Sequence, residues 1–288
     1  MRLSNAGAAY ATGTMETGTR EQRFVFGEVA ELYDRARPGY SAELVDEVLG
    51  YVGLDADRVR ALEVGAGTGK ATVAFAARGL EILALEPSPQ MATIAERNCR
   101  DFPGVRIERT TFENWAVEPG GFGLVFSAQA WHWVDPEVRN GKAVRALRPG
   151  GTLALMGHRV LWQGESLRDE LEELYRRVAP DLRLRDPGFP GLGRGLELER
   201  ELEDDRPSHQ VEETGLFEDV TRQSHPWPAR FTADGFVERL ATQSDHRLVP
   251  EDTREELFAA ARELVAAHGG EIVIPHATVL TLGRVPRP

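Results

Sequence analysis

Three glycines at two-residue intervals lie in the stretch LEVGAGTGKA, which runs from Leu62 to Ala71. Gly65, Gly67 and Gly69 follow a short apolar run and precede a helical pattern. Glycine has no Cβ, so the backbone of such a turn can pass close to a bound nucleotide or nucleoside. The loop therefore predicts a site for a ligand that contains a nucleoside, and its spacing narrows the choice of ligand.

The loop does not match the phosphate-binding loop of nucleoside triphosphatases. That loop has the pattern G-x-x-x-x-G-K-[ST], and its last hydroxyl binds magnesium. Gly69 and Lys70 supply the GK pair, but Val64 stands at the first glycine position and Ala71 replaces the Ser or Thr. A nucleoside triphosphate site of this type is therefore excluded.

The loop also departs from the dinucleotide fingerprint G-x-G-x-x-G/A. Counted from Gly65, the sixth position is Lys70, whose bulk opposes close packing of the helix on the strand. The observed G-x-G-x-G spacing suits a ligand without a pyrophosphate, such as a nucleoside that carries an amino acid.

Glu86 is the second residue with a predicted binding role. It ends the apolar run EILALE, 19 residues after Gly67. A carboxylate at this strand end can accept hydrogen bonds from both hydroxyls of a ribose. Ser88 follows as the candidate N-cap of the next helix.

Apolar runs that alternate with helical patterns predict the elements that position these residues. After a helix over 41–53, strands are expected at 60–65, 81–86, 105–110, 122–127 and 152–157, with helices at 69–79, 88–100 and 136–151. This alternation builds βαβ units on a parallel sheet that is buried on both faces.

In the C-terminal part, predicted strands and helices no longer alternate regularly. A helix is expected over 165–178, and residues 180–213 are too rich in Gly, Pro and charge to form core. The remaining expectations are a strand over 217–231, a helix from Asp234, a helix from Thr253 with a capping box to Glu256, and a final strand over 271–285 with a bend at Pro275.

Composition restricts the class of partner. The 288 residues include 34 basic and 46 acidic side chains, a net charge of −12, so a nucleic-acid partner is not expected. Cys99 is the only cysteine, which excludes an intrachain disulfide and a cysteine-based zinc site, and no metal site is predicted. With neither a signal peptide nor an apolar run of about 18 residues, a cytoplasmic protein that does not enter the membrane is expected.

Four linked stretches carry a resemblance to a known family: ALEVGAGTGK, LALEPSPQM, FGLVFSAQAWHWVD and ALRPGGTLAL. In this order and spacing, the chain resembles the class I S-adenosylmethionine-dependent methyltransferases. FGEVAELYDRARPGY is similar to the N-terminal stretch of the small-molecule (methyltransferase type 11) branch, and AWHWVDP is similar to trans-aconitate methyltransferase-like members. The resemblance covers Phe24 to Val160 well and the C-terminal third more loosely.

The resemblance implies a fold. It is an α/β, Rossmann-like, seven-stranded and mostly parallel sheet of strand order 3-2-1-4-5-7-6, with helices on both faces and a helical insertion after strand 5. The expected domain organisation is a disordered tail over 1–20, a cofactor-binding core over 21–160 and 216–288, and an insertion over 161–215 that caps the acceptor pocket.

The resemblance also implies S-adenosylmethionine as cofactor. Gly65, Ala66 and Gly67 would pack against its methionine part, Glu63 would contact its ammonium, and Glu86 would bind its ribose. The full predicted cofactor site comprises Tyr33, Arg37, Glu63, Gly65, Ala66, Gly67, Gly69, Glu86, Pro87, Ser88, Met91, Thr111, Phe112, Glu113, Ser127, Ala128 and Gln129.

Two parts of this assignment leave alternatives open. Family members usually place an Asp after the third strand to bind the adenine amino group, but Thr111 stands there, so either Glu113 or the backbone at Phe112 takes that role. Tyr33 and Arg37 would belong to an N-terminal lid near the methionine moiety; the alternative is the surface of an amphipathic helix.

The acceptor is expected beyond the carboxyl ends of the strands, where ligands of open α/β sheets bind. Trp131 and His132 leave the fourth strand at this edge, and His132 is the candidate general base; packing between two tryptophans is the alternative. His158 and Arg159 end the fifth strand and would reach the same pocket, where Arg159 would pair with an anionic acceptor.

The predicted function is therefore methyl transfer from S-adenosylmethionine to a small organic acceptor by in-line displacement, mainly through proximity and orientation. The chain is expected to act as a monomer or homodimer. Two alternatives are a non-catalytic protein that binds S-adenosylmethionine or S-adenosylhomocysteine, and an NAD-dependent oxidoreductase.

Overall fold

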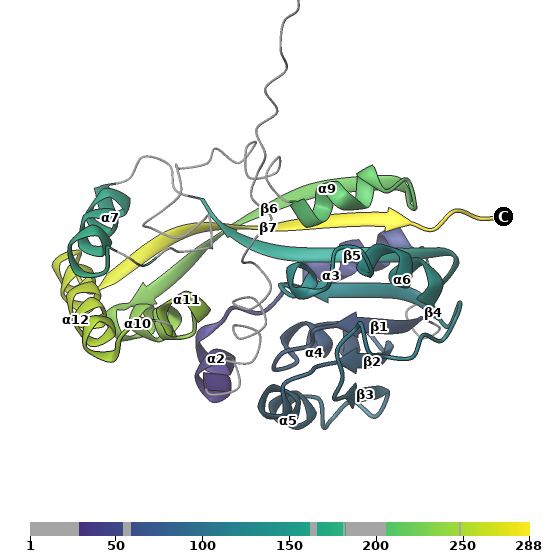
Figure 1. Cartoon of the computed structure of the whole chain (residues 1–288), viewed down its shortest axis with the longest axis horizontal. Coiled ribbons are helices and arrows are strands. Elements are labelled where there is room, and N and C mark those ends of the chain that lie inside the picture. Colours follow the sequence, from purple (N-terminus) through teal and green to yellow (C-terminus); the bar gives the residue numbers. More distant parts are fainter. Residues whose placement is uncertain (1–28, 54–58, 162–165, 181, 183–205, 248) are drawn as a thin grey trace, which may run out of the picture.

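Seven strands form one sheet in the computed structural model of the chain, which describes residues 29–53, 59–161, 166–180, 182, 206–247 and 249–288 (Figure 1). The strands are β1 (Arg60–Val64), β2 (Glu81–Leu85), β3 (Val105–Glu108), β4 (Phe122–Ala128), β5 (Leu147–Val160), β6 (Glu218–Thr232) and β7 (Glu271–Arg284). Their order is β3-β2-β1-β4-β5-β7-β6. β7 runs antiparallel to β5 and β6, and the other strand pairs are parallel. The predicted fold class and strand order are confirmed.

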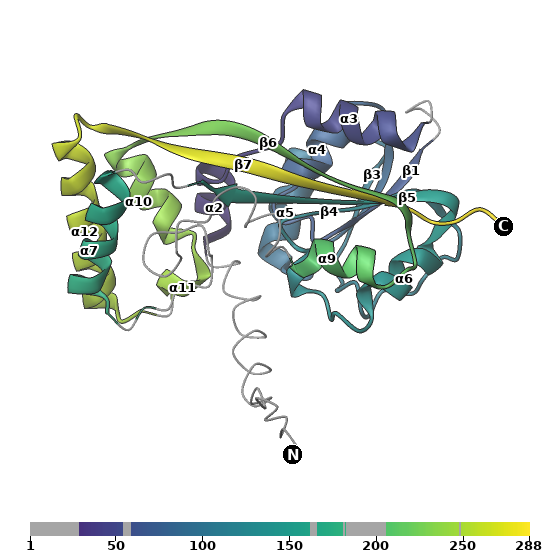
Figure 2. The same cartoon turned by 90° about the horizontal axis from the view of Figure 1, so that it is seen from above.

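Helices cover both faces of this sheet (Figure 2). One face buries α3 (Ala42–Val52) and α4 (Lys70–Ala76), and the other buries α6 (Arg139–Ala146) and α9 (Arg206–Glu213). Successive residues of β1 alternate between the two cores, because side chains of a strand point to opposite faces. Ser41 accepts the N–H of Leu44 and is the predicted N-cap of α3.

The β6–β7 pair continues well beyond the short strands β1, β2 and β3, and it carries a second group of helices at its far end (Figures 1 and 2). This C-terminal lobe consists of α7 (Ser166–Val178), α10 (Ala233–Ala241) and α12 (Glu251–Ala267), with the adjoining ends of β5, β6 and β7. Leu171, Phe236, Leu240 and Leu257 are fully buried in its core. The lobe therefore has its own core, separate from the cores on the two faces of the sheet.

Two shorter helices complete the structure. α2 (Ala30–Ala36) packs on α5 (Pro89–Asn98) through Ala30, Met91 and Ile94 and also contacts α10. α11 (Ser244–Arg247) follows α10.

Two local expectations are wrong or incomplete. α12 begins at Glu251 after Pro250, whose fixed φ suits a helix start, so the capping box from Thr253 does not form. Val211 on α9 is fully buried, although residues 180–213 were expected to lie outside the core; it lies on the buried side of a short amphipathic helix. At Pro275, β7 stays paired with β6 opposite Pro228 without a register shift, and the bend expected there stays a prediction.

The predicted tail over residues 1–20 lies outside the described residues, as does the greater part of the predicted insertion over 161–215. Among the described residues, no helix is long and apolar enough to cross a membrane.

Candidate functional site

The glycine loop follows β1 and is held against the end of β2. The N–H groups of Gly65 and Ala66 both donate to the carbonyl oxygen of Leu85, at 2.9 and 3.0 Å. Gly65, Gly67 and Gly69 all have positive φ, at 77°, 59° and 84°, a region that disfavours residues with a Cβ. The loop is therefore a tight turn that depends on its glycines.

The three glycines differ in what surrounds them. A Cβ on Gly65 would lie 2.3 Å from the Cβ of Ala130, and one on Gly69 would lie 3.2 Å from the Cα of Ala95. A Cβ on Gly67 would meet nothing within 4 Å. Gly65 and Gly69 are thus required by packing against neighbouring loops and helices, whereas Gly67 borders open space.

Glu86 connects this loop to the start of α5. Its Oε2 accepts the N–H of Gly67 and its Oε1 accepts the N–H of Ser88, each at 2.8 Å. The side chain is only 7% exposed, and burial raises the pKa of the carboxyl to about 7. Each oxygen retains a further lone pair that can accept a donor from a ligand.

Glu63 lies near the end of β1 and is completely buried. Its Oε2 accepts the hydroxyl of Thr72 on α4 at 2.5 Å, and its Oε1 has no hydrogen-bond partner. Burial, reinforced by the nearby charge of Glu86, raises the pKa of Glu63 to about 8. Thr72 carried no signal in the sequence, because its contact with Glu63 depends on how α4 packs on β1.

The end of β4 lies on the other side of β1 from β2. The Ser127 hydroxyl donates to the carbonyl of Val64 at 2.8 Å, and the Gln129 N–H donates to that of Met156 at 2.8 Å. Gln129 has a φ of 61°, one of two described non-glycine residues with positive φ. Such backbone strain persists where the surrounding structure requires it and often marks a functional loop.

The residues predicted for the adenine end lie after β3. Phe112 is buried, with its ring 6.2 Å from that of Trp115. The Thr111 hydroxyl accepts the N–H of Asn114, and the Glu113 carboxylate accepts the N–H of Asp135 at 3.1 Å. Both side chains therefore fix the local loops in this structure.

The predicted lid residues lie on and just after α2. Tyr33 packs against the contact between α2 and α5. Arg37 donates from Nε to the Thr242 hydroxyl at 2.8 Å and from Nη2 to the Thr242 carbonyl at 2.9 Å. Its guanidinium therefore links α2 to the end of α10, a contact that the sequence does not indicate.

The tryptophan-histidine stretch forms a short 3₁₀ helix, η3 (Trp131–Trp133). Trp131 is 4% exposed and packs against Phe112, with the ring centroids 5.8 Å apart. His132 is exposed, and its ring lies 4.7 Å from that of Trp133. The two predicted acceptor residues therefore point in different directions.

His158 lies in a cluster of aromatic and polar side chains at the end of β5. Its ring stacks on Tyr40 at 4.8 Å, and its Nδ1 lies 3.0 Å from the Thr278 hydroxyl. Trp227 Nε1 also donates to this hydroxyl at 3.0 Å. His158 Nε2 is buried and has no hydrogen-bond partner among the described residues.

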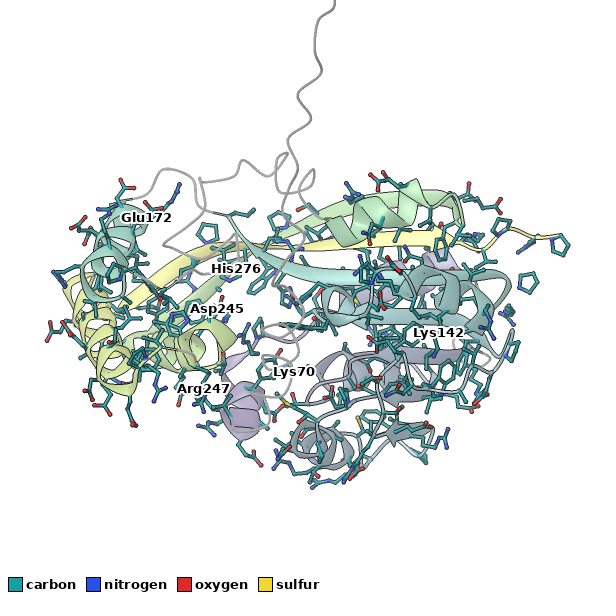
Figure 3. The ribbon with its side chains drawn as sticks, viewed as in Figure 1. Lys70, Lys142, Glu172, Asp245, Arg247 and His276 are labelled. Carbon is teal, nitrogen blue, oxygen red and sulfur yellow. The ribbon has the colours of Figure 1, made fainter. Side chains whose placement is uncertain are left out.

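Positive charge surrounds this imidazole. Burial, with the nearby His276 and the guanidiniums of Arg239, Arg37 and Arg159, lowers the pKa of His158 to about 3. His158 is therefore neutral at physiological pH. Figure 3 shows His276 on β7 near this region, with Asp245 and Arg247 on the neighbouring α11.

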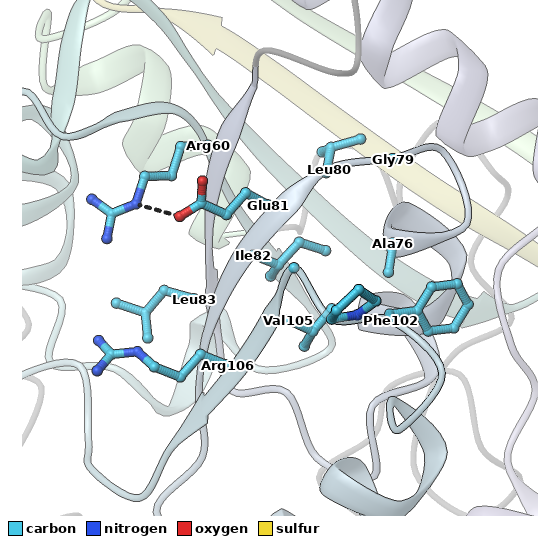
Figure 4. A pocket seen from close by; sticks show the side chains of 12 residues that line it. Arg60, Ala76, Gly79, Leu80, Glu81, Ile82, Leu83, Phe102, Val105 and Arg106 are labelled. Atoms are coloured by element: carbon cyan, nitrogen blue, oxygen red, sulfur yellow. Dashed lines mark ion pairs between the residues drawn. The ribbon is translucent and has the colours of Figure 1, made fainter.

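Two surface cavities have different relations to the glycine loop. One, of about 550 Å³, lies beside the loop and is lined by residues that include Asp34, Tyr40, Gly69 and Lys70. The other, of about 530 Å³, is lined by Arg60, Glu81 and Arg106 at the amino ends of β1, β2 and β3 (Figure 4). Because ligands of open α/β sheets bind at the carboxyl ends, the second cavity is not the candidate site.

Comparison with known proteins agrees with this arrangement. Residues 62–155 match the methyltransferase domain family. An uncharacterized methyltransferase of Mycobacterium tuberculosis is 28% identical over 270 residues, which span 92% of this chain and 97% of that protein. A probable S-adenosylmethionine-dependent methyltransferase of Saccharomyces cerevisiae is 29% identical over 126 residues, 42% of this chain and 43% of that protein.

A solved structure named as a type II methyltransferase, from Anaeromyxobacter dehalogenans, has the same fold. It superposes with a TM-score of 0.60 at 21% identity and covers 88% of this chain and 99% of that chain. The matching domain, the methyltransferase relatives and the shared fold support a class I S-adenosylmethionine-dependent methyltransferase. The predicted family and enzyme class are confirmed.

The crevice of this methyltransferase has features that fit the family's cofactor. The space above Gly67 would accept the ligand, and the buried Glu63 Oε1 lacks a partner that an ammonium could supply. The Glu86 carboxylate retains acceptor sites that ribose hydroxyls could fill. Among the described residues, no group of three His, Cys, Asp or Glu side chains could hold a metal ion.

The contrast between Gly65 and Gly67 can be tested by substitution. We expect Gly67→Ala to fold, because its Cβ enters open space and the cost is that of the positive φ, about 1–2 kcal/mol. Its affinity for S-adenosylmethionine should fall at least about tenfold, because the methyl occupies the crevice. Gly65→Ala should lose more stability in urea titrations, because its Cβ meets Ala130. Wild-type affinity in Gly67→Ala would contradict this assignment.

Burial of Glu63 predicts a pH dependence of stability. Its pKa is raised from 4.5 to about 8 in the folded chain, so the folded state binds this proton more tightly than the unfolded state. The resulting stabilisation is present below about pH 4.5 and is lost as the pH rises to about 8. Glu63→Gln should therefore exceed the wild type in free energy of unfolding by roughly 2–4 kcal/mol at pH 8.5, and by little at pH 5.

Urea titrations of the ligand-free protein from pH 5 to 8.5 measure this difference. Glu137→Gln is a matched control, because Glu137 is exposed and should show no such trend. Parallel stability curves for the wild type and Glu63→Gln would refute the buried, protonated state.

Proposed function

We propose that this methyltransferase binds S-adenosylmethionine in the crevice between the loops that follow β1, β2 and β4, and methylates a small organic acceptor. The observation that carries the proposal is the pairing of Glu86 with the Gly67 N–H beside open space, with Glu63 buried next to it. When bound, the cofactor supplies a methyl group on a positively charged sulfur.

The chain's own residues would contribute mainly binding and orientation. Glu86 would hold the ribose, Glu63 the methionine ammonium, and the backbone of Gly65, Ala66 and Gly67 the methionine part. Ser127, Ala128 and Gln129 would border the cofactor from β4, while Pro87, Ser88, Met91 and the loop with Thr111, Phe112 and Glu113 would border the adenosine. Aligning the reacting groups can contribute about 7–11 kcal/mol.

We propose that the acceptor binds between the crevice and the C-terminal lobe, near His158. This residue is fixed by Thr278 and Tyr40, and its unpartnered Nε2 can make a hydrogen bond to an acceptor. Because Arg37, Arg159 and Arg239 all act on His158, an acceptor with negative charge would be favoured there. The net charge of −12 argues against a nucleic-acid acceptor.

His132 and His158 would then have different roles. The pKa of His158 at about 3 makes it a poor base, so it would position the acceptor as a neutral hydrogen-bond partner. His132 remains the candidate base for an acceptor that must lose a proton, a role that typically contributes about 10²–10⁴-fold. A carboxylate acceptor would need no base. Residues 161–215, whose described part includes α7, would cap the acceptor pocket.

Cofactor binding can be tested by thermal shift with S-adenosylmethionine, S-adenosylhomocysteine, NAD and ATP. We expect the first two to stabilise the wild type and the last two to have no effect. Glu86→Ala should weaken binding of S-adenosylmethionine by roughly 30- to 700-fold, because it removes about 2–4 kcal/mol of charge-assisted hydrogen bonds. Preferential stabilisation by NAD would instead support an oxidoreductase.

The acceptor role of His158 can be tested once a methylated compound is found in a panel of small carboxylic acids, phenols and amines. His158→Asn should raise the KM for that acceptor about 10- to 100-fold and leave the dissociation constant of S-adenosylmethionine within about twofold. Thr278→Val should shift the acceptor KM in the same direction, because it releases the ring. An equal loss of cofactor affinity would place His158 on the cofactor side instead.

A further inference from the structure

Two carboxylates are buried side by side at the carboxyl edge of the sheet. Glu63 and Glu86 lie on adjacent parallel strands, with Val64 of β1 paired to Leu85 of β2. Glu63 is 0% exposed and Glu86 is 7% exposed. Removing a carboxylate from water without a compensating cation is costly, so such a group tends to take up a proton.

The hydrogen-bond donors to these carboxylates are neutral. Glu63 accepts from the Thr72 hydroxyl, and Glu86 accepts from the backbone N–H groups of Gly67 and Ser88. In the described part of the chain, neither carboxylate forms an ion pair with a Lys, Arg or His side chain. The nearest lysine of α4, Lys70, is directed to Asp34 on α2 at 3.9 Å.

The surroundings of Glu63 add no positive charge. The titratable groups that act on it or respond to it are Glu86 at the end of β2, Tyr40 between α2 and α3, and Cys99 after α5. β4 contributes the Ser127 hydroxyl nearby, which donates to the carbonyl of Val64. None of these four groups carries a positive charge that would compensate a charged Glu63, and the negative charge of Glu86 opposes it.

Glu63 also has room for a new partner, since its Oε1 is buried and makes no hydrogen bond. The pKa of about 8 means that Glu63 is mostly protonated at pH 7, whereas the pKa of about 7 leaves Glu86 about half protonated. A positively charged ligand group beside Oε1 would favour the carboxylate form.

We propose that Glu63 is uncharged in the empty crevice and releases its proton to solvent when the cationic methionine end of the cofactor binds, so that it selects ligands by charge. This inference rests on the proposed cofactor site. The O–H bond of the Glu63 carboxyl breaks, its electron pair stays on the carboxylate, and the proton passes to the buffer. Loss of the sulfonium charge on methyl transfer would leave the ammonium beside Glu63, so only part of this proton would be regained.

Three ligands distinguish the proton release from Glu63 from that of Glu86. The positive groups of S-adenosylmethionine are an ammonium and a sulfonium, S-adenosylhomocysteine keeps only the ammonium, and 5′-methylthioadenosine has neither. The first two ligands also carry the same carboxylate, which therefore does not distinguish them. All three carry the ribose that would contact Glu86. The proton released with 5′-methylthioadenosine therefore reports Glu86, and any excess released with the other two reports Glu63.

The number of protons is measured by isothermal titration calorimetry at pH 7 in buffers of different ionisation enthalpy. We expect S-adenosylmethionine to release about one proton more than 5′-methylthioadenosine, and S-adenosylhomocysteine to give a smaller excess. From pH 6.5 to 7.5, the affinity for S-adenosylmethionine should rise roughly five- to tenfold relative to that for 5′-methylthioadenosine, since one released proton corresponds to about tenfold per pH unit.

Two isosteric variants are the matched controls. Glu63→Gln should abolish the excess release and its pH dependence while 5′-methylthioadenosine behaves as with the wild type. Glu86→Gln should reduce the release with 5′-methylthioadenosine and leave most of the excess, because burial remains the main cause of the raised pKa of Glu63. Titration of the ligand's own amine cancels between the wild type and Glu63→Gln.

The outcomes distinguish a failure of the proposed role of Glu63 from a failure of the proposed cofactor site. Equal release with S-adenosylmethionine and 5′-methylthioadenosine in the wild type, or an excess that survives in Glu63→Gln, overturns the role of Glu63 even though the cofactor binds. Absence of binding by all three ligands overturns the cofactor site itself. Because the three-ligand comparison uses the wild type, it decides the question even if Glu63→Gln does not fold.

Discussion

The Glu86 carboxylate accepts the N–H groups of Gly67 and Ser88, and the shape of the crevice depends on these two contacts. They tie the glycine loop after β1 to the start of α5 across the end of β2. The loop can reach Glu86 only because Gly67 adopts a positive φ, and the contact survives burial because both carboxylate oxygens have donors. The chain thus builds a tight turn with open space beside Gly67.

Around this contact, one sheet extends through two parts of the chain. The short strands β1 to β4 and their helices form the crevice, while the long strands β5, β6 and β7 extend to the C-terminal lobe. Arg37 and Thr242 connect the two parts through α2 and α10. The His158 cluster lies where they meet, so an acceptor bound there would contact residues from both halves of the chain.

The charge of the chain is distributed unevenly around this junction. The crevice buries Glu63 and Glu86 among neutral donors, whereas three guanidiniums act on His158. A cationic cofactor group beside the carboxylates and an anionic acceptor beside the arginines would each compensate the local charge. This polarity would also orient the two substrates relative to each other, the main requirement of an in-line transfer.

The sequence by itself determined where the strands and the glycine loop lie, because these depend on local patterns, whereas the strand order was predicted from the family resemblance. Apolar runs fix the strands, and Lys70 and Ala71 exclude the two other nucleotide loops. Tertiary structure alone decided that Thr72 reaches Glu63, that Thr278 holds His158 from 120 residues away, and that Val211 joins the core. Such contacts arise when separate elements pack together, so neither spacing nor periodicity in one stretch of sequence carries them.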